Sequence, residues 1–275
     1  MTSRILERLR CPVCGAAGGS DEAEKVFSCH GAKKHCFDFA KSGYLNLCLN
    51  GKEGDSKAAV QARSLFLEAG YYQPLSDALN GLLDEIGAET VLDAGSGEGY
   101  YTNRMARDGR EVLGADLSRF GVDHGAKTAK RLGCGASFAV ASVYTLPVES
   151  GSFDAVTNLF APCAEEEFCR VLKTGGTLIL VGAGERHLMG LKSLLYDNPY
   201  LNLGRNDLPK QMRLCKELHI RETVTVKGND MICALFSMTP YYWRTSERDI
   251  SKLNGVERLE TELDFDIFVY RKELD

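Results

Sequence analysis

Five short apolar segments, separated by stretches with a helical pattern, place the strongest constraint on the fold of this 275-residue chain. Short apolar runs bounded by turn residues predict buried strands, and their alternation with helices predicts a doubly wound, mostly parallel α/β sheet. In such a sheet the ligand binds at the carboxyl ends of the strands. Apolar spacing also predicts two helices over residues 57–86, joined by a turn at residues 70–74. The predicted strands are 90–95, 111–116, 137–142, 153–159 and 177–182.

A glycine-rich loop, Asp93-Ala-Gly-Ser-Gly-Glu-Gly-Tyr-Tyr-Thr102, follows the first predicted strand. A dinucleotide-binding loop needs its third glycine where Tyr100 stands, and a tyrosine is too large for the close approach of a pyrophosphate. The loop therefore disfavours NAD. Asp93 lies near the end of the first predicted strand and Asp116 ends the second, so two carboxylates are expected at this loop.

Five of the ten cysteines lie before residue 50, and two of them form a Cys11-x-x-Cys14 pair. Such a turn offers two thiolates to one tetrahedral Zn²⁺, and a closed site needs two further Cys or His ligands. A redox role is the competing interpretation, but a redox Cys-x-x-Cys motif belongs where a strand leads into a helix, whereas turn residues follow this one. We therefore favour zinc. Four candidates exist for the two remaining ligands: Cys29, His30, His35 and Cys36.

The composition is that of a globular chain, with 44% hydrophobic and 26% charged residues. No apolar run approaches the roughly 18 residues that a membrane span needs, and the first ten residues are too charged for a signal peptide. We therefore expect a cytoplasmic protein with no membrane partner. The formal net charge is −5, yet residues 1–57 carry nine Lys and Arg against seven Asp and Glu. A bound polyanion is therefore expected to contact the N-terminal segment.

The polar stretch Asn-Gly-Lys-Glu-Gly-Asp-Ser at residues 50–56 predicts a linker. We expect a zinc-binding recognition module over residues 1–50 and a catalytic domain over residues 51–275. Because about 50 residues cannot bury much core of their own, the metal is expected to supply most of the folding free energy of the module.

Further short stretches, spread over nearly the whole chain, match the sequence motifs of one known family. On them the chain resembles the RlmA family, bacterial guanine-N1 methyltransferases of 23S ribosomal RNA that include macrolide-resistance members. Ala161-Pro-Cys163 and Arg186-His-Leu-Met189 are the most specific, because they are not general methyltransferase motifs. The other matching stretches are 37–38, 43–47, 61–63, 66–67, 69–75, 97–102 and 238–240 with Trp243.

The resemblance implies a class I S-adenosylmethionine (SAM) dependent methyltransferase, with a Rossmann-like doubly wound sheet and a small N-terminal zinc-binding module for RNA recognition. It implies that the methionine part of SAM lies against the glycine loop, that Asp116 accepts hydrogen bonds from the ribose, and that Ser142 lies beside the adenine. The implied cofactor-binding residues are Tyr72, Asp93, Gly95, Gly97, Glu98, Gly99, Tyr100, Asp116, Ser142 and His187.

The resemblance also selects the metal ligands, as three cysteines and one histidine that precedes a residue-Phe-Asp sequence. In this chain that histidine is His35, before Cys36-Phe-Asp. The gap between Cys29 and His35 is longer than is usual in the family, which keeps His30 and Cys36 as alternative ligands. The implied zinc ligands are Cys11, Cys14, Cys29 and His35.

The implied substrate is a guanine in a hairpin of 23S rRNA. Guanine N1 carries a proton and lies on the pairing edge, so the base must be unpaired or flipped and must lose that proton. Two other functions stay open: methylation of a small molecule or protein, and non-catalytic RNA binding or ribosome assembly. A homodimer is also considered, and no catalytic base is assigned. The expected acceptor-pocket residues are Asn158, Ala161, Pro162 and Cys163.

Overall fold

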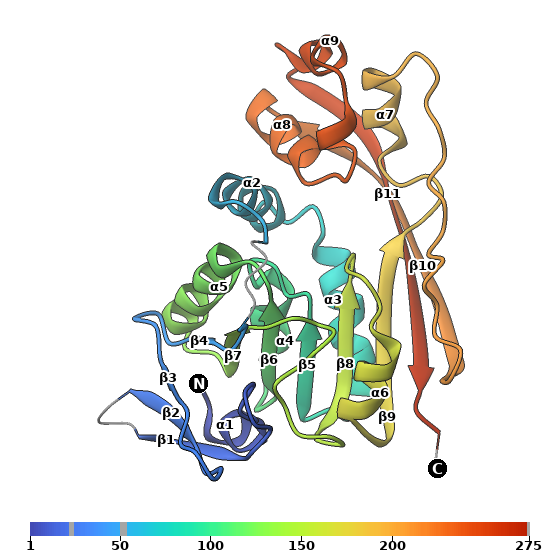
Figure 1. Cartoon of the computed structure of the whole chain (residues 1–275). Coiled ribbons are helices and arrows are strands. Elements are labelled where there is room, and N and C mark those ends of the chain that lie inside the picture. The colour runs from blue at the N-terminus through green and yellow to red at the C-terminus, as the bar shows by residue number, and fades with distance from the viewer. Residues whose placement is uncertain (22–24, 50–53, 274–275) are drawn as a thin grey trace.

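The computed structural model describes residues 1–21, 25–49 and 54–273, which form two sheets (Figure 1). The strands of the larger sheet are β4 (Leu45–Asn46), β5 (Thr90–Ala94), β6 (Glu111–Asp116), β7 (Ala136–Val140), β8 (Phe153–Leu159), β9 (Leu172–Ala183), β10 (Arg213–Lys227) and β11 (Arg258–Arg271). Their order is β10-β11-β9-β8-β5-β6-β7-β4. Pairing is parallel from β4 to β9, whereas β11 is antiparallel to both β9 and β10.

The prediction of a doubly wound, mostly parallel sheet is confirmed, and all five predicted strands are present as β5 to β9. The two helices predicted before them are α2 and α3. The helical elements are α1 (Ser3–Arg8), α2 (Lys57–Glu68), α3 (Gln73–Glu85), α4 (Tyr100–Met105), α5 (Arg119–Leu132), α6 (Glu165–Val171), α7 (Met189–Leu195), α8 (Asn229–Ser237), η1 (Tyr242–Arg244), α9 (Glu247–Ile250) and η2 (Ser251–Leu253).

Local sequence sets the helix ends. The hydroxyl of Ser56 accepts a hydrogen bond from the N–H of Ala59 at the start of α2, and that of Ser118 accepts one from Gly121 at the start of α5. Helix α5 ends at Gly133, which has a φ of +64°. Glycine adopts this left-handed conformation without the strain that a side chain would cause.

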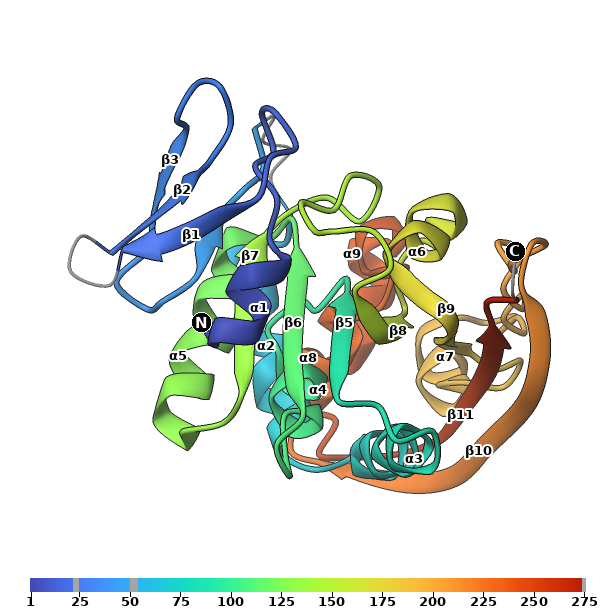
Figure 2. The ribbon, with the colours of Figure 1, turned by 90° about the horizontal axis from the view of Figure 1, so that it is seen from below.

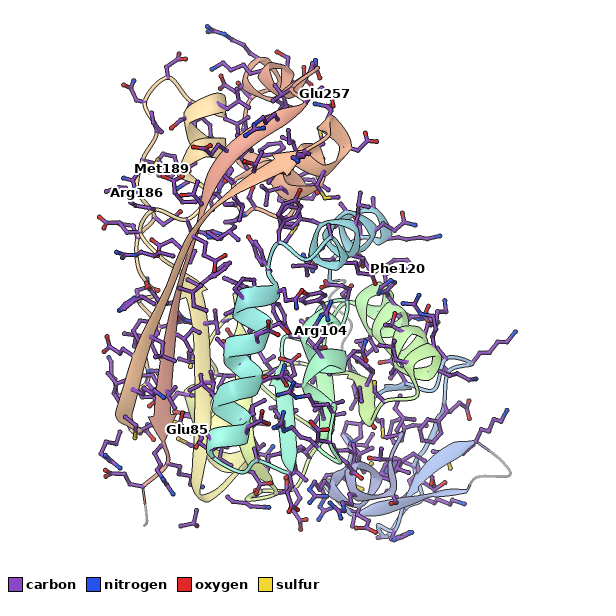
Figure 3. The ribbon with its side chains drawn as sticks, turned by 180° about the vertical axis from the view of Figure 1, so that it is seen from behind. Glu85, Arg104, Phe120, Arg186, Met189 and Glu257 are labelled. Atoms are coloured by element: carbon purple, nitrogen blue, oxygen red, sulfur yellow. The ribbon has the colours of Figure 1, made fainter. Side chains whose placement is uncertain are left out.

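Each face of the sheet has its own core, because successive strand residues point to opposite sides. Val91 and Ile179 are fully buried on the face that α3 and α4 cover, and α3 lies along this face in Figure 3. Leu92 and Leu180 are fully buried on the other face, against α1 and α6.

The N-terminal segment packs against the rest of the chain. It forms a small antiparallel sheet of β1 (Gly18–Asp21), β2 (Val26–Cys29) and β3 (Cys36–Asp38), seen at one side of the molecule in Figure 2. Phe27 and Leu9 are fully buried in the same core as Leu92, and β4 pairs with β7. Burial of apolar surface therefore stabilises this segment independently of any metal. Residues 50–53 of the predicted linker lie outside the described residues.

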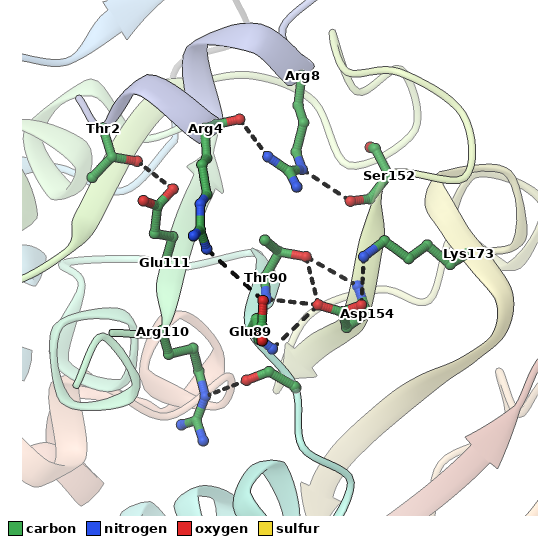
Figure 4. Close-up of polar contacts among 11 residues, drawn as sticks. Thr2, Arg4, Arg8, Glu89, Thr90, Arg110, Glu111, Ser152, Asp154 and Lys173 are labelled. Carbon is green, nitrogen blue, oxygen red and sulfur yellow. Dashed lines mark hydrogen bonds and ion pairs between the residues drawn. The ribbon is translucent and has the colours of Figure 1, made fainter. Parts of the chain in front are cut away.

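Polar contacts attach α1 near the amino-terminal ends of the parallel strands (Figure 4). The hydroxyl of Thr2 donates to Glu111 at the start of β6 (2.8 Å), and the guanidinium of Arg8 donates to the carbonyl of Ser152 just before β8 (3.0 Å). These contacts place α1 at the end of the sheet opposite to the end where a doubly wound fold binds its ligand.

The C-terminal part rises beyond the carboxyl ends of the parallel strands. Figure 1 shows the upper ends of β10 and β11 with α7, α8 and α9 around them, facing α2 across the top of the sheet. Strand β10 is an edge strand with mostly exposed or half-buried side chains, so its sequence lacks the apolar run of a buried strand. In the described ranges, no helix is both long and apolar enough to cross a membrane.

Candidate active site

A cavity of about 760 Å³ lies at the carboxyl ends of β5, β6, β8 and β9, bounded also by α8 and the residues after it. This is the edge of the sheet where the fold predicts a ligand. Nine of the predicted site residues line the cavity: Tyr72, Asp93, Gly95, Gly97, Glu98, Asp116, Ala161, Pro162 and His187.

The glycine loop after β5 brings bare main chain to the cavity. Gly95, Gly97 and Gly99 have φ values of +89°, +53° and +81°, which side chains rarely adopt. A Cβ atom on Gly95 would lie only 2.6 Å from the Cβ of Ala161. Glycine is therefore required at position 95 both by its backbone angle and by its close contact with the loop after β8.

Asp93 holds the loop in place from within the sheet. Its side chain is 2% exposed and accepts hydrogen bonds from the hydroxyls of Thr102 (2.5 Å) and Thr157 (2.9 Å). Burial raises the pKa of Asp93 to about 6, although both hydroxyls oppose this shift. Asp93 thus connects β5 to α4 and β8.

Asp116 ends β6 with a carboxylate that lines the cavity. One oxygen accepts the N–H of Gly97 (2.9 Å) and the other accepts the N–H of Ser118 (2.7 Å). Because an ionised carboxylate has about four acceptor positions, both oxygens can accept a further hydrogen bond. Burial raises the pKa of Asp116 above its usual value. The acceptor positions that remain on the two oxygens fit a pair of ligand hydroxyls, as expected for a ribose.

An ion-pair chain joins the glycine loop to α2. The buried carboxylate of Glu98 lies 3.2 Å from the guanidinium of Arg63, which also binds Asp55 at 2.5 Å. Opposite charges attract more strongly where water is excluded, so the pair between Arg63 and the buried Glu98 fixes α2 over the loop. Glu98 was predicted at the site, whereas the sequence did not single out Arg63 or Asp55 as site residues.

Tyr72 and His187 meet at the cavity wall, although 115 positions separate them in the chain. Their Oη and Nε2 atoms are 3.0 Å apart, and both side chains are buried. Burial lowers the pKa of His187 to about 4 and raises that of Tyr72, so both are neutral near pH 7. The structure thus brings together two residues that the sequence predicted at one site.

Hydrogen bonds within the loop after β8, and others from Arg205 in a distant segment, fix the conformation of this loop. The side-chain amide of Asn158 donates to the carbonyls of Ala94 (2.9 Å) and Pro162 (3.3 Å). Arg205 donates to the Asn158 side chain (3.2 Å) and to the carbonyl of Ala161 (2.9 Å). These contacts hold the expected acceptor loop against the glycine loop.

Four N-terminal side chains form a separate cluster: Cys11, Cys14, Cys29 and His35. Their ligand atoms all lie within 4.8 Å of one another. His30 and Cys36 are not members of this cluster, since His30 lies near Gly19 and the thiol of Cys36 contacts Ser28. The geometry therefore selects His35 among the candidates.

The spacing within the cluster fits a tetrahedral metal. The sulfur atoms of Cys14 and Cys29 are 3.7 Å apart, and Nδ1 of His35 lies 3.5 Å from the sulfur of Cys11 and 3.4 Å from that of Cys29. Ligands at zinc bonding distances span about 3.8 Å between two sulfurs and about 3.5 Å between sulfur and nitrogen. N–H groups of Gly31 and His35 lower the pKa of Cys29 to about 6, which favours a thiolate.

Comparisons with known proteins agree with this site. Residues 91–176 match the family model of a methyltransferase domain. A Streptomyces fradiae protein, 23S rRNA (guanine(748)-N(1))-methyltransferase, is 29% identical over 97% of this chain and 98% of its own length. A Micromonospora griseorubida protein named for 23S rRNA guanine-N1 methylation is 31% identical over 68% of this chain and 69% of its own length. The chain belongs to the 23S rRNA (guanine-N1)-methyltransferase family.

The fold of this methyltransferase also matches solved structures of low sequence identity. One of them has a TM-score of 0.50 and 17% identity. It is the structure of a protein from work on the conversion of a disulfide bond into a thioacetal group during echinomycin biosynthesis. The match covers 71% of this chain and 81% of that chain. At this identity it supports the class I methyltransferase fold alone, and SAM is the cofactor that the methyltransferase family implies.

Some predicted residues of the methyltransferase do not line the cavity: Gly99, Tyr100, Ser142, Asn158 and Cys163. Tyr100 stacks below the guanidinium of Arg104 at 4.3 Å, and the hydroxyl of Ser142 accepts the N–H of Tyr144. Burial raises the pKa of Cys163 to about 11, so its thiol is not an ionised nucleophile near pH 7. Their cofactor and acceptor roles stay predictions.

Sequence reasoning did not assign several polar residues of the cavity wall to the site: Asp55, Arg63, Asn202, Arg205 and Asp207. They come from α2, from the residues before it, and from the irregular segment between α7 and β10. The two irregular segments have no hydrophobic period, and the period of α2 places its apolar face but not a polar residue such as Arg63. The one available signal was the matching stretch 61–63, which contains Arg63.

Proposed function

We propose that this protein transfers the methyl group of SAM to N1 of a guanine in a hairpin of 23S rRNA. A single cavity carries the proposal, because it is lined both by the glycine loop with Asp116 and by the loop after β8. Membership of the family supports the RNA substrate. A rival function, methylation of a small molecule or protein, does not account for the Cys₃His cluster.

The chain's own residues would hold SAM from three sides. Main chain of the glycine loop would approach the methionine part, and Asp116 would accept hydrogen bonds from the ribose hydroxyls. Nδ1 of His187 accepts the N–H of Asp264, so Nε2–H donates to the Tyr72 oxygen. Tyr72 would therefore donate its hydroxyl proton to a polar group of the cofactor. Burial of Tyr72 makes this bond stronger than it would be in water.

Bound SAM supplies an electrophilic methyl group on a sulfonium. The protein has to hold the acceptor nitrogen in line with this group and to exclude water. Phe160 is suited to face the acceptor base, because it lines the cavity, is 47% exposed and has a φ of +52°. A strained aromatic residue beside a ligand cavity is a common feature of functional sites.

The Cys₃His cluster would hold one structural Zn²⁺, since four protein ligands close a tetrahedral site. We assign RNA recognition to residues 1–50, where Lys33 and Lys34 lie exposed between two of the metal ligands. The boundary at residue 50, the hairpin as partner, a homodimer and a cytoplasmic location belong to the same proposal.

The direct test is methylation of transcribed 23S rRNA by the purified protein with labelled SAM, followed by nucleoside analysis. N1-methylguanosine is the expected product, and it should be missing from the rRNA of a strain that lacks the gene. Label in a small molecule or a protein, with none in the rRNA, would establish the rival activity. SAM binding without any methyl transfer would favour a non-catalytic RNA-binding or assembly role.

A further inference from the structure

Asp207 is an acidic residue of the cavity wall that none of the proposed cofactor contacts uses. It belongs to the irregular segment between α7 and β10, yet it lines the same cavity as Gly95 and Asp116. Its side chain is 37% exposed, so a ligand in the cavity can contact it.

Three donors orient the Asp207 carboxylate. Arg205 binds it with two N–H groups, one to each oxygen at 2.8 Å, and the main-chain N–H of Cys163 donates to Oδ2 at 2.8 Å. Since a carboxylate offers about four acceptor positions, two on each oxygen, these contacts leave one position on Oδ1. The group is thus fixed in orientation and has room for one more donor.

The contacts also place Asp207 beside the expected acceptor loop. Arg205 holds the carbonyl of Ala161, and Cys163 follows two positions later. The Cβ of Ala161 in turn lies against Gly95, which we assign to the cofactor cradle. Asp207 therefore lies next to the loop after β8, where this loop contacts the proposed cofactor cradle.

We propose that Oδ1 of Asp207 accepts the N1 proton of the target guanine and is a catalytic residue, an inference that rests on the proposed function. N1 forms its bond to the methyl carbon while the carbon–sulfur bond breaks and sulfur keeps that electron pair. The electrons of the N1–H bond stay on the guanine, and the proton moves to Asp207 and then to water.

The surroundings suit this role. Partial burial raises the pKa of Asp207, but hydrogen bonds from Arg205 and Cys163 outweigh it and hold the pKa below its usual value. The carboxylate is therefore ionised near pH 7, and N1–H becomes acidic as N1 bonds to carbon. An adenine in the same position would present a lone pair at N1 to the carboxylate, so Asp207 also selects guanine.

The test compares Asp207→Asn with wild type on transcribed 23S rRNA between pH 6 and pH 9. The variant keeps the shape of the side chain, and we expect turnover about 10²–10⁴-fold lower near pH 7. Its rate should rise about tenfold per pH unit, because guanine then loses its N1 proton to solvent. Wild type should show a flatter profile, and SAM affinity measured by calorimetry should not change.

Glu165→Gln is the matched control. Glu165 accepts the N–H groups of Lys210 and Gln211, so it binds the same segment, but it does not line the cavity. Its variant should retain wild-type turnover and pH profile. Equal turnover in Asp207→Asn and wild type, or an equal loss at every pH, would overturn the role of Asp207 and leave the proposed function intact.

The experiment distinguishes failure of the proposed function from failure of the role of Asp207. Wild type that forms no N1-methylguanosine would overturn the proposed function itself. If Asp207→Asn fails to fold by its melting curve, Asp207→Glu takes its place, because it retains a carboxylate that is displaced by one methylene. This variant should lose turnover and keep the flat profile, whereas a rate that climbs tenfold per pH unit would contradict the proposal.

Discussion

The main-chain N–H of Asp264 donates to Nδ1 of His187 at 3.2 Å, on the side of the ring opposite to Tyr72. Nδ1 is therefore an acceptor, and a neutral ring must carry its proton on Nε2. Nε2–H then donates to the Tyr72 oxygen at 3.0 Å, which leaves the Tyr72 proton for a ligand in the cavity.

Because His187 is buried as a neutral ring, the protein should lose stability as the pH falls. Its pKa is about 4 in the folded protein because the ring is buried, against 6.5 in an unfolded chain. The unfolded state binds the proton first as pH falls, so stability from this group is complete above pH 6.5 and is lost toward pH 4. Between pH 7 and pH 5 the loss should be about 2 kcal/mol. Urea unfolding of wild type and His187→Gln would measure it.

Asp93→Asn should change the pH dependence of stability in the direction opposite to His187→Gln. The folded pKa of Asp93 is about 6, above the ordinary 3.8, so the folded state binds the proton first and gains stability as pH falls from 6 toward 3.8. Relative to wild type, His187→Gln should flatten the loss toward acid and Asp93→Asn should steepen it. Parallel curves for all three proteins would contradict both assignments.

Asp116→Ala should weaken SAM binding by at least about tenfold. The variant removes charge-assisted hydrogen bonds to the ribose that are worth about 1.5–3 kcal/mol each. Calorimetry with SAM measures the change. Asp123→Ala is a suitable control. Asp123 lies on α5 away from the cavity, where it binds Ser42 and Lys127, so this variant should leave SAM affinity unaltered. Equal affinities in all three proteins would remove Asp116 from the cofactor site.

Gly95→Ala should lose both stability and SAM affinity. The new Cβ would be strained by the φ of +89° and would collide with Ala161 at 2.6 Å. Gly151→Ala isolates the strain, since Gly151 has a φ of +61° but nothing lies within 4 Å of its Cβ position. It should cost about 1–2 kcal/mol of stability and leave SAM affinity unchanged. An unaltered affinity in Gly95→Ala would show that the loop tolerates the collision.

Elemental analysis should find one zinc per chain in the reduced protein. Cys29→Ser should lose the metal, because serine does not replace a thiolate ligand, whereas Cys36→Ser and His30→Ala should retain it. Retention by Cys29→Ser together with loss by Cys36→Ser would reverse the choice of ligands. Protein without zinc in any preparation would refute the metal site.

Reversing the charge of Lys33 and Lys34 should weaken rRNA binding and lower its salt dependence. For each lysine that no longer binds a phosphate group, the slope of log affinity against log salt should fall by about one. Lys130→Glu, also exposed but on α5, is the control. Point variants are preferable to removal of residues 1–50, because that deletion would uncover the core face around Leu92. Unchanged slopes would separate the cluster segment from RNA recognition.

The parallel strands, the glycine loop and the family could all be predicted from the sequence. These features are local: apolar runs of five to seven residues specify β5 to β8, and positive φ values account for the glycines at 95, 97 and 99. Two of the predicted partners, Tyr72 and His187, could be found only through the resemblance, because no local pattern links residues 115 positions apart.

The choice of metal ligands, the support of the N-terminal segment and the polar wall of the cavity depend on tertiary packing. The N–H of Cys29 donates to the carbonyl of His35, and this chain reversal brings His35 and not His30 to the thiols. Arg205 and Asp207 reach the loop after β8 across more than 40 positions. Contacts of this kind arise from how distant segments pack, and a sequence period describes only neighbours along one helix or strand.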